Sequence, residues 1–201
     1  MKLPALLLIC AATLAAHASP TQANDTTQPL PAFERVLQMS PPRAIAPFTL
    51  TDHLGKRRDW STFAGTPTLV FFGFTNCPDI CPTTLQKLAQ LKTSHSAALQ
   101  GVQVVLISVD GERDTPAVMS EYLASFSKDF IGLTGPAAEV REIALRFSAP
   151  FFKDPPKDGA YVVQHSSRLY AIDRRGRLRA ELYDATTEAT TGIARALLAE
   201  R

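Results

Sequence analysis

The chain has 201 residues, of which 20% are charged and 45% are hydrophobic, and its formal net charge is +2 with neutral histidines. These values are typical of one soluble globular domain and leave no room for a second domain of normal size. No basic run is longer than "KRR" at 56–58 or "RRGR" at 174–177, and nucleic-acid-binding signatures are absent, so we predict that the protein binds neither DNA nor RNA.

The first 18 residues have the pattern of a secretory signal peptide. Lys2 supplies the positive charge, and an apolar run of fourteen residues from Leu3 to Ala16 follows it. Small residues at Ala16 and Ala18 predict cleavage before Ser19, which would release the mature protein into the periplasm. The apolar run is shorter than the ~20 residues of a membrane span. The alternative is a retained anchor that holds the protein on the inner membrane, facing the periplasm.

Residues 19–46 are rich in Thr, Gln and Pro and lack a long apolar periodicity, so we predict a tether there. Cys10 does not indicate a lipoprotein, because Ile9 precedes it where a small residue is needed and because it lies inside the apolar run. Residues 47–201 are then the folded domain, and no segment within it is apolar over enough residues to span a bilayer.

Two short strands and a longer buried one open the folded domain. The sequence "FTLTDHLGKRRDW", 48–60, predicts two strands around a turn at Gly55. The continuous apolar run at 66–75 predicts a strand that is buried on both faces. A helix follows, and 101–110 is a second buried strand. A strand, a helix and a strand at this spacing form a βαβ unit, so we expect the two strands to be parallel.

The second half of the domain alternates helices and strands. Thr115 caps one helix, a short strand at 130–135 follows, and Pro136 begins another helix. The remaining predicted elements are a hairpin with its turn at Arg175–Gly176 and a closing helix at 186–199. This order predicts a thioredoxin-like α/β fold, with a central mixed β-sheet flanked by helices. The chemistry of such folds lies at the C-terminal end of the first central strand.

Cys77 and Cys81, in "FTNCPDICPTTL", lie where this chemistry is expected. One turn of helix separates them, with ~6 Å of axial rise, so they can form a disulfide or hold one ion together. A purely structural disulfide is disfavoured, because closing so short a loop stabilises a fold little. We expect the N-terminus of the helix to lower the pKa of both thiols and to make thiolates accessible near neutral pH. The redox and metal interpretations both remain open.

A soft-metal site needs a third ligand, and the candidates are the four histidines. His17 belongs to the signal peptide, and we expect His53 and His95 to lie on the surface. His165 opens the predicted strand "HSSRLYAID", which starts at the same end of the sheet as the cysteine loop. From this position, His165 is either a metal ligand or an ordinary histidine at the end of a strand.

Four motifs, in this order and spacing, resemble those of the SCO/SenC family: "FFGFTNCPDICPTTL", "LISVDGERDTP", "YLASFSKDFIGLTG" and "YVVQHSSRLYAID". The resemblance runs from about Phe48 to the C-terminus. It implies a copper-binding, thioredoxin-like protein that takes part in assembly of the CuA centre of cytochrome c oxidase, with Cys77, Cys81 and His165 as copper ligands. Asp79 matches the acidic residue of the family's cysteine motif, and it is either a residue that acts beside the metal or a cap at the entry of the helix.

Two residues depart from the family pattern. Gln164 stands where an Asp is common, which puts in question the charge and hydrogen bonding beside His165. Gly111 stands where a Pro is common, and we expect this change to affect only a loop. Two thiolates and one imidazole suit Cu(I) and can also hold Cu(II). Because metal binding needs reduced thiols, a Cys77–Cys81 disulfide excludes copper, and the redox and metal interpretations become two states of one site.

The leading hypothesis is a periplasmic copper chaperone that delivers one ion to the CuA centre of oxidase subunit II. The alternatives are a thiol–disulfide oxidoreductase that uses Cys77 and Cys81 to reduce the cysteines of the CuA centre, and a redox sensor. A histidine as third ligand favours a chaperone over an enzyme, and the absence of a Met-rich tract predicts a single copper site. The expected partners are subunit II, a further periplasmic copper chaperone as donor and a thiol reductant, and we expect a monomer.

Overall fold

The computed structural model describes residues 28–94, 98–156 and 161–200. The predicted signal peptide at 1–18, with Cys10 and His17, lies outside the described residues, as does His95. Within the described ranges, no helix combines the length and the apolar character that crossing a membrane requires.

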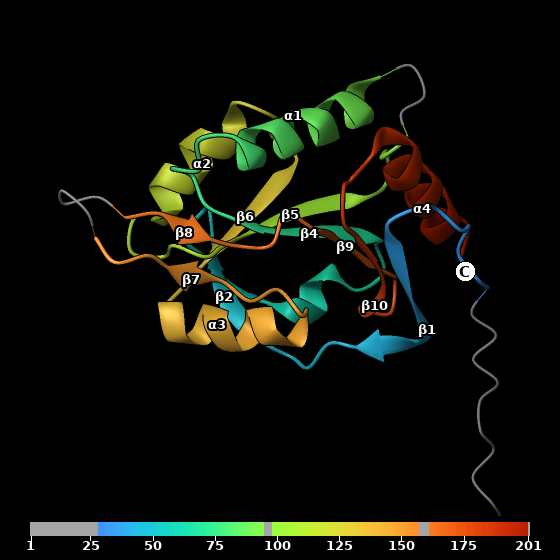
Figure 1. Cartoon of the computed structure of the whole chain (residues 1–201), viewed down its shortest axis with the longest axis horizontal. Coiled ribbons are helices and arrows are strands. Elements are labelled where there is room, and N and C mark those ends of the chain that lie inside the picture. The colour runs from blue at the N-terminus through green and yellow to red at the C-terminus, as the bar shows by residue number, and fades with distance from the viewer. Residues whose placement is uncertain (1–27, 95–97, 157–160, 201) are drawn as a thin grey trace, which may run out of the picture.

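One mixed β-sheet forms the centre of the molecule (Figure 1). In the described part of the chain it has eight strands, which in spatial order are β1 (Val36–Ala44), β10 (Arg177–Leu182), β9 (Leu169–Ile172), β4 (Thr68–Gly73), β5 (Gln103–Ser108), β6 (Phe130–Thr134), β2 (Thr49–Asp52) and β3 (Arg57–Asp59). Strands β4, β5 and β6 run parallel, and the other neighbouring pairs are antiparallel. A separate two-stranded sheet pairs β7 (Phe152–Lys153) with β8 (Val163–Gln164).

Helices cover the sheet on both sides. They are α1 (Ile80–Thr93), α2 (Pro116–Ala124), α3 (Ala137–Arg146), α4 (Thr187–Ala199) and the short 3₁₀ helix η1 (Trp60–Phe63). Figure 1 shows α1 and α2 on one side of the sheet and α3 on the other. The predicted thioredoxin-like fold, with a mixed central sheet flanked by helices, is therefore confirmed, and so is the parallel β4–α1–β5 unit.

The central strand β4 explains why the sheet needs cover on both faces. All six of its residues are buried, and they are apolar apart from Thr68 and Gly73. In a strand successive side chains point to opposite faces, so a continuous apolar run is stable only between two layers. Its partner β5 follows the same rule, with five of six residues buried. The site of interest lies just beyond the C-terminal end of β4.

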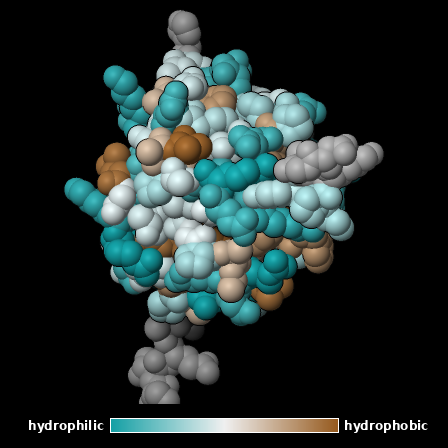
Figure 2. Space-filling model, turned by 90° about the vertical axis from the view of Figure 1, so that its left-hand side faces the viewer, coloured by the Kyte–Doolittle hydropathy of each residue, from teal (hydrophilic) through white to brown (hydrophobic). Residues whose placement is uncertain are grey.

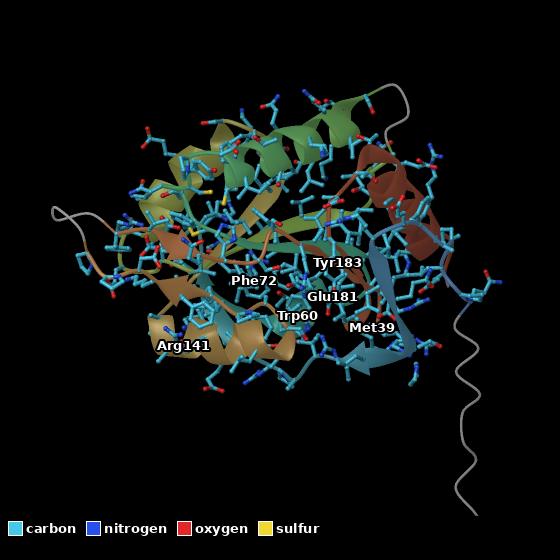
Figure 3. All side chains as sticks on the ribbon, in the orientation of Figure 1. Met39, Trp60, Phe72, Arg141, Glu181 and Tyr183 are labelled. Atoms are coloured by element: carbon cyan, nitrogen blue, oxygen red, sulfur yellow. The ribbon has the colours of Figure 1, made fainter. Side chains whose placement is uncertain are left out.

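An aromatic cluster fills the space between the sheet and α3. Phe147, at the end of α3, contacts Phe72 of β4 and Tyr170 of β9 edge to face, with ring centroids 5.3 and 5.7 Å apart. It also contacts Phe48 and Trp60, which stack on each other at 5.0 Å. Figure 3 shows Phe72 and Trp60 in this layer. The cluster ties α3 and η1 to the strand that carries the cysteine loop.

Strand β1 corrects the C-terminal part of the tether predicted over 19–46, while residues 19–27 lie outside the described residues. Residues Val36–Ala44 pair antiparallel with β10, and Leu30 and Ile45 on either side are buried. Two of the prolines that suggest a tether, Pro41 and Pro42, fall where the register of β1 shifts, between Gln38 and Arg43. An edge strand tolerates prolines at such an irregularity, because its outer amides need no partner in the sheet.

The turn between β2 and β3 is built around a buried carboxylate. Asp52 accepts hydrogen bonds from the amides of Leu54 and Lys56 at 3.0 and 2.9 Å and from both Nε and Nη2 of Arg58. Burial alone would raise the pKa of Asp52, but the bonds from Lys56, Arg58 and Leu54 outweigh it and hold the pKa below its usual range. The folded structure therefore favours the charged form of Asp52.

We expect Asp52→Asn to destabilise the protein by about 2 kcal/mol at pH 7, because hydrogen bonds to a charged group are among the stronger ones. The folded pKa lies below that of the unfolded chain, about 3.9. The carboxylate therefore contributes its stability above that pH and loses it as pH falls through the folded pKa. Urea unfolding at several pH values should show parent and variant converging in acid. The exposed Glu142→Gln is the control, and a constant difference down to low pH would contradict the prediction.

Candidate metal centre

Two cysteines and one histidine meet beyond the C-terminal end of β4. Cys77 lies in the loop between β4 and α1, Cys81 lies in the first turn of α1, and His165 follows β8. One ligand atom from each of the three lies within 4.8 Å of the others, and both cysteines are free. Residues 88 positions apart are thus brought into one cluster that can hold a metal ion.

Cys81 is the most deeply placed member of the cluster. Its side chain has no exposed surface, and its sulfur occupies the space beside Gly73, where an added Cβ would lie 2.9 Å from Sγ. Burial raises the pKa of the Cys81 thiol well above its usual range, and the neighbouring Cys77 adds to this effect. The expectation that the helix N-terminus would lower both thiol pKa values is therefore wrong for Cys81. The loss of solvent outweighs the helix dipole there.

The loop that carries Cys77 is held by a buried aspartate. Asp114, which has no exposed surface, accepts hydrogen bonds from the amide and the hydroxyl of Thr75 at 3.0 and 2.6 Å. Ser108, at the end of β5, donates to the same carboxylate at 2.6 Å. Burial raises the pKa of Asp114 in spite of these donors. Asp114 lies in the motif "LISVDGERDTP", but nothing in that motif alone indicates that it holds the cysteine loop.

His165 lies in the loop between β8 and β9 rather than at the start of a strand, because β9 begins only at Leu169. Its Nδ1 lies 2.9 Å from the carbonyl oxygen of Ser166. This contact needs a proton on Nδ1, so it leaves the lone pair of Nε2 free. Nε2 faces the cysteines, 3.4 Å from Sγ of Cys81 and 4.0 Å from Sγ of Cys77. His165 is thus predicted at the right end of the sheet, beside the cysteine loop, but it reaches this position from a loop and not from a strand.

The surroundings of His165 keep the imidazole neutral and fix its plane. Phe71 and Phe74 contact the ring edge to face, with centroids 6.0 and 5.5 Å away. Burial lowers the pKa of His165, although hydrogen bonds to the backbone of Ser166 and Phe72 act in the opposite direction. A neutral imidazole with one nitrogen anchored by a carbonyl group and the other unprotonated and facing the cysteines is the arrangement found in protein metal ligands.

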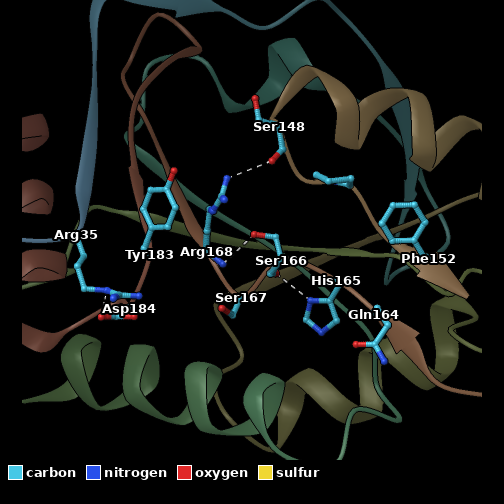
Figure 4. Close-up of a pocket in the computed structure, with 11 residues that line it drawn as sticks. Arg35, Ser148, Phe152, Gln164, His165, Ser166, Ser167, Arg168, Tyr183 and Asp184 are labelled. Carbon is cyan, nitrogen blue, oxygen red and sulfur yellow. Dashed lines mark hydrogen bonds and ion pairs between the residues drawn. The ribbon is translucent and has the colours of Figure 1, made fainter. Parts of the chain in front are cut away.

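The outer side of His165 borders an open pocket of about 470 Å³ (Figure 4). Ser166 and Arg168 also line this pocket, and Arg168 reaches the buried Glu181 at 3.0 Å.

Gln164, one of the two departures from the family pattern, donates a hydrogen bond from its side-chain amide to Asp154 at 3.0 Å. The other departure, Gly111, lies in the loop after β5.

Asp79 does not join the cluster. It is exposed and takes the N-cap position of α1, but its side chain makes no capping hydrogen bond. Its Oδ1 instead lies 3.4 Å from the hydroxyl of Thr83.

His53, which is expected on the surface, is only partly exposed. Its side chain is half-buried, and its Nδ1 accepts a hydrogen bond from the amide of Gly132 at 3.2 Å.

The donor set of the cluster selects soft or borderline ions. Two sulfurs and one imidazole nitrogen suit Cu(I) or zinc far better than magnesium or calcium, which need oxygen ligands. Three protein ligands leave zinc short of the four that a structural zinc site uses. The neutral thiol of Cys81 loses its proton when a metal ion binds, and the charge of the ion then replaces the missing solvent.

Comparisons with known proteins agree on one family. The family model described as SCO1/SenC matches residues 38–198. The human mitochondrial protein SCO1 homolog is 34% identical over 146 residues, which cover 71% of this chain and 48% of that protein. A bovine mitochondrial SCO2 homolog is 39% identical over 132 residues, covering 64% of this chain and 50% of that protein. The chain thus spans about half the length of these mitochondrial relatives.

Two solved structures of similar proteins contain copper. ScoI of Bradyrhizobium japonicum with copper bound is 37% identical, has a TM-score of 0.69, and is matched over 77% of this chain and 99% of that chain. ScoI of Arabidopsis thaliana with copper bound is 33% identical, also with a TM-score of 0.69, over 78% of this chain and all of that chain. The similarity extends over nearly the whole of each solved domain.

Proposed function

Since this chain belongs to the SCO1/SenC family, we propose that it binds one copper ion through Cys77, Cys81 and His165 and passes it to the CuA centre of cytochrome c oxidase subunit II. The observation that carries the proposal is the approach of Nε2 of His165 to both sulfurs, at 3.4 and 4.0 Å. The similarity to proteins solved with copper bound supports the choice of metal.

A site with these three ligands suits a carrier. Two thiolates and an imidazole bind Cu(I) tightly in three-fold coordination and can also hold Cu(II). Three ligands also leave room for an incoming ligand, so the ion can pass to a partner by exchange of one ligand at a time. The expected donor is another copper chaperone, and a thiol reductant keeps Cys77 and Cys81 able to bind.

We place this function in the periplasm, after cleavage between Ala18 and Ser19, with a retained inner-membrane anchor as the alternative. An oxidase subunit that exposes its copper centre outside the inner membrane would be reached in either case. Mass spectrometry of the protein from its native envelope distinguishes the two by the first residue found.

The surface around the site offers a partner both apolar and polar contacts. Ile80, between the two cysteines, is exposed, as are Phe152 of β7 and Val162 beside β8. Figure 2 shows this side of the molecule, where separate hydrophobic patches lie among hydrophilic side chains. Such a mixed surface is typical of transient complexes rather than permanent ones. It is consistent with a monomer that meets its partner briefly.

The proposal is tested by direct transfer. Protein loaded with Cu(I) is mixed with the soluble CuA domain of the oxidase in its reduced, metal-free form, so that no reductase is needed. After transfer, a one-electron oxidant such as ferricyanide is added, because a centre that holds only Cu(I) has no visible absorbance. We then expect the absorbance of the oxidised CuA centre to appear with the parent. With His165→Ala, which removes one ligand of three, we expect the yield of correctly loaded centre to fall at least about tenfold.

His53→Ala is the matched control, because it removes another half-buried histidine that is not part of the cluster. It should transfer copper as the parent does. If copper remains on the parent protein in the presence of the reduced CuA domain, delivery is refuted.

A second candidate function rests on the pairing of Cys77 and Cys81. Both thiols are free, and they lie close enough to join as a disulfide with small movement. The copper-free dithiol form could therefore reduce the cysteines of an oxidised CuA domain. The buried, neutral thiol of Cys81 is a poor nucleophile, however, because the thiolate is the reactive form. The reductase role takes precedence if the dithiol reduces that domain and transfer fails.

A further inference from the structure

The hairpin that leads into His165 is short. Strands β7 and β8 contribute two residues each, paired as Phe152 with Gln164 and Lys153 with Val163. One further backbone bond joins the amide of Asp154 to the carbonyl of Val162 at 2.9 Å. A two-stranded hairpin of this size is marginally stable by itself in water. Its position next to the cysteines must be set by contacts with the rest of the protein.

Tyr161, four residues before His165, makes one such contact. Its hydroxyl donates to Oδ1 of Asp110 at 2.7 Å. The guanidinium carbon of Arg113 lies 3.9 Å from the centroid of its ring, and Nζ of Lys153 lies 4.4 Å from it. Cations this close to an aromatic face attract it, and more strongly where water is partly excluded. The ring thus joins the hairpin to the loop between β5 and α2.

The residues that Tyr161 contacts, in the loop between β5 and α2, are themselves held in place. Asp110 is buried, with 1% of its surface exposed, and lies two residues after the end of the buried strand β5. Arg113 forms an ion pair with Asp110, and Lys153 of the hairpin approaches the same carboxylate at 3.5 Å. A buried carboxylate that lost these partners would carry a large desolvation cost, so the arrangement is strongly preferred. Partial burial, followed by the bond to Asp110, raises the pKa of Tyr161, so the phenol stays a donor at neutral pH.

The same arginine also reaches the cysteine loop. The guanidinium of Arg113 lies 5.8 Å from the ring centroid of Phe74, and Phe74 contacts the ring of His165 at 5.5 Å. Arg113 therefore touches both the hairpin that precedes His165 and the aromatic wall against which the imidazole packs. The backbone carbonyl of Tyr161, 3.5 Å from Nη1 of Arg113, adds a further link.

We propose that Asp110, Arg113 and Tyr161 form a clamp that positions the imidazole of His165 over the two cysteines. With the clamp closed, the site offers three ligands. With Tyr161 released, the hairpin keeps the β7–β8 pairing and the buried Val163, and the His165 ring keeps its aromatic neighbours, but the bond to Asp110 is lost. The imidazole is then held less firmly than the two sulfurs. The clamp thereby sets the affinity of His165 for copper and the rate at which His165 dissociates from the ion. This role rests on the proposed function, in which His165 is a copper ligand.

The clamp is tested by a double-mutant cycle on the full chain. Tyr161→Ala is made in the parent and in the His165→Ala background, and Cu(I) affinity is measured by competition with a chromophoric Cu(I) chelator. We expect Tyr161→Ala to weaken binding about tenfold in the parent, as loss of a residue that orients a metal ligand does. In the His165→Ala background we expect no further loss, because no imidazole remains to be positioned.

Two further variants control for effects on folding. Tyr161→Phe keeps the ring over Arg113 and removes only the hydroxyl, so it should give a smaller loss of the same kind. Val162→Ala changes an exposed side chain in the same hairpin and should bind copper as the parent does. In the Cu(II)-loaded protein, nitrogen hyperfine coupling from the imidazole should weaken with Tyr161→Ala and persist with Val162→Ala.

The outcomes separate the clamp from the site that it serves. Equal losses in both backgrounds would mean that Tyr161 supports the fold or the cysteines, and the clamp would be refuted. It would also be refuted if His165→Ala weakens binding but neither Tyr161 variant changes affinity or hyperfine coupling. If His165→Ala itself leaves the affinity unchanged, the ligand assignment fails, and the clamp fails with it.

Discussion

Cys81→Ser is expected to abolish tight binding of Cu(I), with an affinity loss on the order of a thousandfold, or about 4 kcal/mol. The reason is the position of the sulfur, which is fully buried on α1 and 3.4 Å from the imidazole nitrogen of His165. A hydroxyl oxygen is a poor ligand for so soft an ion, and it cannot take the negative charge of a thiolate at neutral pH. A titration against a competing chelator measures the loss.

The control for this substitution is Thr84→Ser, which changes another buried side chain of α1 without touching the cluster. Since a buried serine at 81 could also weaken the fold, Cys77→Ser serves as a second variant, because Cys77 lies in a loop. Thermal unfolding of the metal-free proteins checks that each variant is folded. Full stoichiometric binding by either cysteine variant would refute the assigned ligand set.

The largest effect on stability is expected from Phe147→Ala. Phe147 has no exposed surface and contacts rings on η1, β4 and β9, so its loss opens a cavity at the junction of three elements. Removing a buried Phe side chain typically costs about 3–5 kcal/mol. For a chain of this size, that corresponds to a fall in Tm of about 10 °C.

Leu145→Ala, in the same helix, is the matched control, because Leu145 is 57% exposed and its loss should change Tm little. Differential scanning calorimetry of the metal-free proteins compares the two. A fall of only a degree or two for Phe147→Ala would mean that the neighbouring rings close the cavity. The aromatic cluster would then contribute much less to the attachment of α3 than its contacts indicate.

The order of elements could be predicted because it depends on local patterns. The buried strands β4 and β5 are continuous apolar runs, and Thr115 caps α2 through a side-chain bond to the amide of Val118. Pro136, which is expected to begin a helix, likewise takes the N-cap position of α3. Each of these signals lies within a few residues of the feature that it specifies.

Strand β1 and the depth of Cys81 could not be predicted in the same way. The pairing of β1 joins Val36 to Leu182, far along the chain, and the strand contains prolines that locally favour an extended tether. The thiol pKa of Cys81 was inferred from its place at a helix N-terminus, whereas the space beside Gly73 decides it. Both features depend on which distant segments pack together.

Spacing combined with resemblance predicts the three proposed ligands. It does not predict the residues that hold these ligands in place. Tyr161 and Asp110 are 51 residues apart, and nothing in either segment alone indicates a bond between them. The bond between Thr75 and Asp114 spans 39 residues. In this protein, local sequence patterns do not predict the residues that hold the site in place.

The packing of the Cys81 sulfur against Gly73 determines the order in which the three proposed ligands can be exchanged. Cys81 is closed off from solvent by the sheet and by α1, whereas Cys77 and His165 both lie on loops. For an ion held by all three, an atom from another molecule can approach only from the side of the two loops. Under the proposed function, an incoming ligand would displace Cys77 or His165 before it displaced Cys81. An ion would arrive and leave by the same route in opposite orders, and Cys81 would be its last contact with the protein.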